Sequence, residues 1–264
     1  MNFSFSKIMG ILNLTPDSFY DGNRYLAEKA MLNRVEQMLN EGADIIDIGG
    51  FSSRPGSELV TQDEESKRIF PAIEKILYYF PDAYLSVDTY RSRIAMEVVD
   101  MGVKMINDIS GGELDKNMFK IIAKLQVPYV MMHMQGIPEN MQDNPEYYDV
   151  VNDIMVYFLK KIDKLNQLNF DKIIIDPGFG FGKTLQHNFE ILNRLDEFQL
   201  LKKPVLVGMS RKSMFYKLLQ TNPSEVLNAT SVGHTIALLK GAKILRVHDV
   251  KEAVEVVRII EQLK

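Results

Sequence analysis

Polar and charged side chains directly follow a series of short apolar segments along this chain. They are Asn13 with Asp17 and Asp21, Asp47, Ser53 with Arg54, Asp88, Asn107 with Asp108, His133, Asp176, Ser210 to Ser213 with Arg211 and Lys212, and Arg246 with His248. Carboxylates accept hydrogen bonds, amides donate and accept them, and cations donate them and bind anionic groups. A single aspartate after a strand is usually a helix cap, but arginine and lysine cannot cap a helix N-terminus. Because acidic and basic side chains both recur after these segments, the pattern predicts a ligand site.

The segments that must position these side chains are apolar and β-branched, and longer amphipathic stretches separate them. The candidate strands are 7–12, 44–48, 84–87, 103–106, 127–131, 172–175, 204–207 and 243–247, and the candidate helices include 27–41, 62–79, 91–101, 115–125, 148–168, 212–220, 224–240 and 250–263. Strands that alternate with helices predict a parallel α/β sheet. Eight strands favour a single-domain (β/α)8 TIM barrel over residues 1–264, with a doubly wound open sheet as the alternative. In a barrel, the polar residues converge on the C-terminal ends of the strands.

Composition excludes several classes of protein. The net charge is −4, from 31 basic and 35 acidic residues, and no basic stripe is present, so a nucleic-acid partner is not expected. No apolar run approaches the ~20 residues of a membrane span, and the first residues lack an export signal, so we expect a cytoplasmic protein without a membrane partner. The chain has no cysteine, which excludes disulfides, a thiolate nucleophile and thiolate metal ligands.

Three local motifs resemble known sites but fail on spacing. The run PGFGFGKT (177–184) has proline where a phosphate-binding P-loop needs its first glycine. The run GMSRK (208–212) has lysine where a nucleophile elbow needs glycine. The four histidines, His133, His187, His234 and His248, are far apart, which disfavours a zinc site. We interpret His187 and His234 as ordinary helix residues.

Eight longer signatures, taken in order, resemble the bacterial dihydropteroate synthases, a family of pterin-binding enzymes. They are MGILNLTPDSFYDG (9–22), DIGGFSSRPG (47–56), SVDTYR (86–91), INDISGG (106–112), MMHMQG (131–136), DPGFGFGK (176–183), GMSRKS (208–213) and RVHDV (246–250). The family condenses 6-hydroxymethyl-7,8-dihydropterin diphosphate with p-aminobenzoate by an SN1-like mechanism, and it releases 7,8-dihydropteroate and pyrophosphate in folate biosynthesis. The resemblance implies a transferase that binds these small molecules and sulfonamide inhibitors, and that forms a homodimer.

The resemblance also implies a role for individual residues. The implied pterin-binding residues are Asp88, Asn107, Asp176, Lys212 and Arg246, and the implied diphosphate-binding residues are Asn13, Arg246, His248 and Ser53. The implied p-aminobenzoate-binding residues are Ser53, Arg54, Phe181, Lys212 and Ser213. The implied catalytic residues are Asp88, Lys212, Arg246, Asp17, Asp21 and Arg54. Asn13 is further implied as a ligand of Mg²⁺, the expected cofactor.

Other functions compatible with a barrel are less well supported. The nearest is a methyltetrahydrofolate-dependent corrinoid methyltransferase, which would not need the SRKS run at 210–213 or the Arg246 and His248 anion site. A non-catalytic pterin-binding protein would be expected to lack one of Asn13, Asp88, Lys212 and Arg246, and all four are present. The aspartate-rich rim disfavours a sugar-phosphate enzyme. The sequence departs from the family at two positions: Ser53 stands where the family usually has threonine, and Phe51 stands where it commonly has glutamate or serine. We expect these departures to affect the affinity for p-aminobenzoate and inhibitors and not the reaction.

Overall fold

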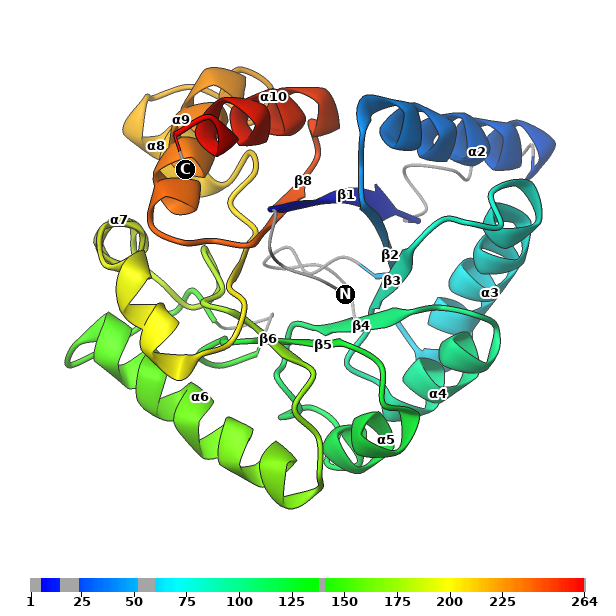
Figure 1. Cartoon of the computed structure of the whole chain (residues 1–264), viewed down its shortest axis with the longest axis horizontal. Coiled ribbons are helices and arrows are strands. Elements are labelled where there is room, and N and C mark those ends of the chain that lie inside the picture. Colours follow the sequence, from blue (N-terminus) through cyan, green and yellow to red (C-terminus); the bar gives the residue numbers. More distant parts are fainter. Residues whose placement is uncertain (1–5, 15–23, 52–59, 138–140, 264) are drawn as a thin grey trace.

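Eight parallel strands surround the centre of the molecule, and helices surround the strands (Figure 1). The computed structural model describes residues 6–14, 24–51, 60–137 and 141–263. The strands are β1 (Lys7–Asn13), β2 (Ile45–Gly49), β3 (Leu85–Asp88), β4 (Met105–Asp108), β5 (Tyr129–Met132), β6 (Ile173–Asp176), β7 (Leu206–Val207) and β8 (Ile244–Val247). Each overlaps a predicted strand, and the predicted (β/α)8 TIM barrel is confirmed.

Each strand from β1 to β5 pairs in parallel with the next, β7 pairs with β8, and β8 pairs with β1. The ring is weakest between β6 and β7, where an isolated bridge links Ile175 of β6 to Val205, the residue just before β7. The pairing register places Asp88 beside Gly49 on one side and beside Asn107 on the other. Polar residues from neighbouring strands are therefore brought together at one end of the barrel.

The helices pack against the outside of the barrel (Figure 1). They are α2 (Arg24–Glu41), α3 (Gln62–Tyr79), α4 (Ser92–Asp100), α5 (Met118–Leu125), α6 (Val150–Gln167), α7 (Leu185–Asn193), α8 (Ser213–Leu218), α9 (Leu227–Leu239) and α10 (Val250–Glu261), with a 3₁₀ helix η1 (Leu195–Leu201) after α7. Helix α3 begins and ends at the predicted residues. None of the described helices is both long and apolar enough to cross a membrane.

A layer of apolar side chains fills the barrel interior. It consists of Met9, Ile45, Met105, Val130, Ile174, Leu206 and Ile244, all of them buried. Because alternate residues of a strand point to the same face, the residue two positions further along also faces the interior. On four of these strands that residue is polar or charged, namely Asp47, Asn107, Asp176 and Arg246. A polar layer thus lies directly above the apolar layer, at the carboxyl ends of the strands.

Candidate active site

The centre of the polar layer is an arginine held by two carboxylates. The Nε atom of Arg246 on β8 donates to Asp47 Oδ2 on β2 at 2.7 Å, and its Nη2 atom donates to Asp88 Oδ2 on β3 at 2.9 Å. The Asn107 side chain on β4 donates to the same Asp47 oxygen at 3.0 Å. The two bonds from Arg246 fix the plane of its guanidinium against β2 and β3.

Several buried oxygen atoms in this layer have no hydrogen-bond partner among the described residues. They are Asp47 Oδ1, Asp88 Oδ1 and the hydroxyl of Ser86. A buried acceptor without a partner costs ~1–3 kcal/mol, so such atoms mark a place where a ligand can supply the missing donors. Asp47 is fully buried, and the family resemblance assigned it no role. Its one sequence signal is an aspartate within the apolar strand IIDIG.

Burial shifts the ionisation of the carboxylates and of Lys212. It raises the pKa of Asp88 to about 7, while Arg246 acts in the opposite direction. Burial also raises the pKa of Asp176. It lowers the pKa of Lys212 to about 7, although the Asp176 charge opposes this effect. Groups with pKa values near neutrality can be hydrogen-bond donors or acceptors according to what binds them.

A glycine-rich loop after β6 brings Lys212 and Asp176 to the same side of the site. The backbone N–H of Gly178 donates to Asp176 Oδ1 at 2.8 Å. The Lys212 ammonium bonds to the Phe179 carbonyl, and it lies 4.1 Å from the centre of the Phe181 ring. A Cβ atom at Gly180 would lie 3.1 Å from Lys212 Cδ, so the absence of a side chain there leaves room for the lysine. The loop and Lys212 therefore form one wall.

Asn13 and His248 lie at the same end of the barrel as the central arginine. A Cβ atom at Gly49 would lie 3.4 Å from Asn13 Oδ1 and 3.8 Å from Asp88 Cβ, which places Asn13 at the same rim. The His248 ring is oriented by the Ser210 hydroxyl, which lies 3.1 Å from its Nδ1 atom. Within the described residues, no group of three or more histidine, aspartate or glutamate side chains could hold a metal ion.

Three further polar residues at the carboxyl ends of the strands make contacts within the protein. Arg211 forms an ion pair with Asp249 at 2.7 Å. Asp108 accepts from the backbone N–H groups of the turn that follows it and from the Tyr129 hydroxyl at 2.6 Å. His133 is buried, and its Nδ1 atom lies 3.1 Å from Lys183 Nζ.

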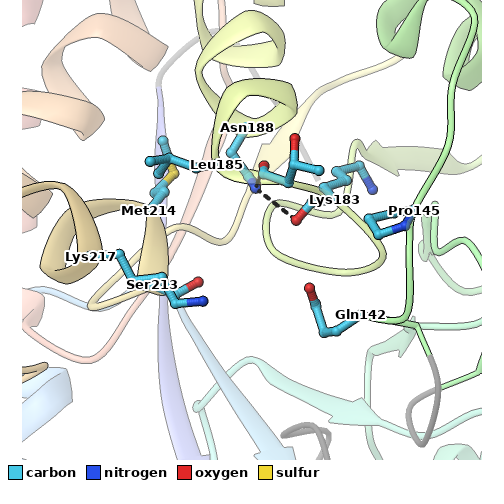
Figure 2. Close-up of a pocket in the computed structure, with 9 residues that line it drawn as sticks. Gln142, Pro145, Lys183, Leu185, Asn188, Ser213, Met214 and Lys217 are labelled. Carbon is cyan, nitrogen blue, oxygen red and sulfur yellow. Dashed lines mark hydrogen bonds between the residues drawn. The ribbon is translucent and has the colours of Figure 1, made fainter.

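Ser213, the first residue of α8, lines a pocket beside the glycine-rich loop (Figure 2). The pocket has a volume of about 130 Å³ and lies between the segment that holds Gln142 and the beginnings of α7 and α8. Lys183 and Asn188 line its opposite side, and the Asn188 amide bonds to the Lys183 carbonyl at 3.5 Å. Because Ser213 directly follows Lys212, the pocket adjoins the wall formed by Lys212 and Phe181.

Four predicted site residues, Asp17, Asp21, Ser53 and Arg54, lie outside the described residues. The described residues on either side of 52–59 are held at the rim. Arg68 donates to the Gly50 carbonyl at 3.1 Å, and Arg91 bonds to the Val60 carbonyl and to the buried Glu65 carboxylate. The remaining predicted site residues, Asn13, Asp88, Asn107, Asp176, Phe181, Lys212, Ser213, Arg246 and His248, all lie at or after the carboxyl ends of the strands.

Comparisons with known proteins agree on one family. The sequence model of the family described as "Pterin binding enzyme" matches residues 9–248. The dihydropteroate synthase of Escherichia coli K12 is 42% identical over 263 residues, which cover 99% of this chain and 93% of the relative. The crystal structure of Yersinia pestis dihydropteroate synthase with a sulfonamide drug superposes with a TM-score of 0.92 at 41% identity, covering 100% of this chain and 95% of that one. The Xanthomonas albilineans enzyme in complex with 7,8-dihydropteroate gives a TM-score of 0.88 at 33% identity, with the same coverage.

Proposed function

Because the chain belongs to the family of pterin-binding enzymes, we infer that it is a dihydropteroate synthase, a transferase of folate synthesis. It joins 6-hydroxymethyl-7,8-dihydropterin diphosphate to p-aminobenzoate and releases pyrophosphate, and sulfonamides are its inhibitors, as the sulfonamide complex of the Yersinia relative supports. The observation that carries the inference is the polar layer above the barrel core, where Arg246 is fixed between two carboxylates that keep unpaired oxygens. Residues 1–264 are proposed to act as one domain, and a homodimer in the cytoplasm stays a prediction.

The dihydropterin is proposed to lie flat on the polar layer. Asp176 Oδ1 already accepts from Gly178, so its Oδ2 atom is left to accept from the 2-amino group and N3–H of the pterin. Lys212 would donate to the carbonyl and N5 side. Asp88 and Asn107 would bind the opposite edge, where the unpaired Asp88 oxygen supplies an acceptor. The face of the fixed Arg246 guanidinium is available to stack on the ring.

The diphosphate is proposed to leave on the side of Arg246 and His248, with Ser53 as a further donor. Asn13 is exposed, and its amide oxygen is a hard donor of the kind that suits Mg²⁺, an ion that takes few protein ligands and binds substrate phosphates. Mg²⁺, when bound there, would neutralise charge on the departing diphosphate. Arg246 and His248 would hold that group in place and exclude water from its inner face.

The chemical step needs no covalent enzyme intermediate. The bond from the pterin methylene carbon to the diphosphate oxygen breaks, and its electron pair leaves with pyrophosphate. The resulting cation is delocalised over the pterin ring, where the carboxylates of Asp88 and Asp176 stabilise positive charge. The p-aminobenzoate amine attacks the methylene carbon and then loses a proton. Phe181, Lys212 and Ser213, with Ser53 and Arg54, would orient this amine, and Asp17 and Asp21 are proposed to close the site.

The direct test is pyrophosphate release from the purified chain supplied with the pterin diphosphate. We expect rapid release with Mg²⁺ and p-aminobenzoate, with formation of 7,8-dihydropteroate in equal amount. Chelation of Mg²⁺ with EDTA should reduce the rate by ~100-fold or more, because the charge of the leaving group is then neutralised by protein cations alone. A sulfonamide should compete with p-aminobenzoate. Pyrophosphate release without dihydropteroate would contradict the proposed function.

The rate should depend on pH through Asp88 and Lys212, whose pKa values both lie near 7. Below this pH, Asp88 takes up a proton and loses an acceptor for the pterin, and above it Lys212 loses its positive charge. We therefore expect kcat/KM for the pterin diphosphate to peak near pH 7 and to fall on both sides, because this parameter reports groups of the unliganded enzyme. The Asp88→Asn variant should lack the acidic limb. A wild-type profile that is flat from about pH 5 to 9 would contradict this assignment.

A further inference from the structure

Each carbonyl oxygen in the glycine-rich loop from Gly178 to Gly182 accepts a hydrogen bond. The Gly178 carbonyl accepts from the Phe181 N–H at 3.1 Å, and the Phe179 carbonyl accepts from Lys212. The Gly180 carbonyl accepts from the Gln142 amide, the Phe181 carbonyl from Lys183 at 2.8 Å, and the Gly182 carbonyl from the Tyr147 hydroxyl at 2.7 Å. Five consecutive carbonyls are thus held, four of them by side chains.

Two of these donors come from a different segment of the chain. Gln142 and Tyr147 belong to the segment that follows β5, and Figure 2 shows Gln142 extending from that segment toward the loop. The Tyr147 ring packs edge-on against His187 at 5.0 Å and lies 6.0 Å from the buried His133. These contacts hold the Tyr147 ring in place while its hydroxyl donates to the Gly182 carbonyl.

The loop needs such anchors because of its composition. Gly178, Gly180 and Gly182 all have positive φ, at 72°, 81° and 59°. Glycines that adopt this conformation lose more conformational entropy on ordering than other residues, so a loop rich in them is fixed only by contacts made elsewhere. The beginning of the loop is fixed separately, by the bond from the Gly178 N–H to Asp176.

We propose that Tyr147 and Gln142 are positioning residues for the arylamine end of the reaction. They hold the loop so that the Phe179 carbonyl and the Phe181 ring meet Lys212. Gln142 also lines the pocket beside Ser213, whereas Tyr147 is not among the residues that line it. The proposal rests on the synthase function proposed above. Loss of either anchor should displace Phe181 and leave the pterin contacts of Asp176 in place, because Asp176 is tied to the start of the loop.

The test compares Tyr147→Phe with Tyr148→Phe, a matched control because the neighbouring Tyr148 is fully exposed. For Tyr147→Phe we expect KM for p-aminobenzoate to rise about fivefold to tenfold, as for the removal of one hydrogen bond. Neither kcat nor the calorimetric affinity for the pterin diphosphate should change by more than about twofold. Hydrogen exchange in peptides covering residues 177–184 should accelerate in Tyr147→Phe and not in Tyr148→Phe.

Gln142→Leu provides a second variant that is not expected to unfold the chain, because Gln142 is exposed. It should also raise KM for p-aminobenzoate and accelerate exchange in the same peptides. The positioning role alone would be overturned if the wild type is active and both variants keep the wild-type KM for p-aminobenzoate. It would also be overturned if both variants lose as much affinity for the pterin diphosphate as for p-aminobenzoate. A wild type that forms no dihydropteroate would overturn the synthase function and this role with it.

Discussion

Replacement of Arg246 with alanine is expected to lower kcat/KM for the pterin diphosphate by ~1,000-fold or more, because a buried, charge-assisted interaction with the transition state is worth several kcal/mol. Arg246 is the cation fixed between Asp47 and Asp88, and it is proposed to stabilise the departing diphosphate. Without it, the leaving group would face two buried carboxylates and no compensating charge from β8. Steady-state kinetics measure the loss of kcat/KM, and calorimetry with pyrophosphate measures the loss of affinity for the leaving group.

The controls for this variant separate charge from geometry. Arg246→Lys keeps the charge but loses the paired bonds to both carboxylates, so it should recover only a small part of the activity. Arg258→Ala removes an exposed arginine from α10, the helix that follows β8, and should leave activity unchanged. Unaltered pyrophosphate affinity in Arg246→Ala would show that another group binds the leaving group.

The same variant should change how stability depends on pH. Removal of one partner from a buried ion pair typically costs ~3–5 kcal/mol of unfolding free energy. Arg246 lowers the pKa of Asp88 against the dominant effect of burial, so its removal should raise that pKa further above 7. When the pKa of a carboxyl is higher in the folded than in the unfolded state, the free energy of unfolding decreases as pH rises toward the folded-state pKa. Stability of Arg246→Ala should therefore continue to fall above pH 7, where this contribution levels off in the wild type.

The strands and the end of the barrel that carries the chemistry could be predicted because both depend on local pattern. Short β-branched runs ending in polar residues indicated eight strands in the correct order, and alternation along each strand set which residues face inward. Asp47 shows the limit of this reasoning. It lies two residues after Ile45 of the apolar layer, but its bonds to Arg246 and Asn107 depend on strands far away in sequence.

The sequence could not show which of two neighbouring cationic side chains enters the site, because contacts with residues far away in sequence decide where each side chain points. Arg211 and Lys212 both follow β7, yet the positive φ of Arg211 and its ion pair with Asp249 direct it away from the site, while Lys212 turns toward Phe181. Lys183 ends a motif that resembles a phosphate loop. In the structure it is buried, with its amine on the Phe181 carbonyl and beside His133.

The Asp176→Asn variant should lose most of its affinity for the pterin diphosphate and keep its fold. The Gly178 N–H donates to one oxygen of Asp176, and this bond would orient the new amide with its carbonyl toward Gly178. The NH₂ group would then take the position of the second oxygen and face the 2-amino group of the pterin. One hydrogen bond is removed and two donors oppose each other, so we expect a loss of about 3 kcal/mol, which is ~100-fold in affinity.

The fold of Asp176→Asn should survive because the substitution is isosteric and removes a buried carboxylate whose pKa is raised by burial. A buried group that is costly to ionise is replaced by one that carries no charge, so the melting temperature should not fall. Asp171→Asn is the matched control, because Asp171 is exposed and lies just before the other end of the same strand, β6. Calorimetry with the pterin diphosphate should separate the two variants by the full ~100-fold expected for the mismatched donors. Equal affinities would mean that Asp176 orders the glycine-rich loop through Gly178 and does not bind the pterin.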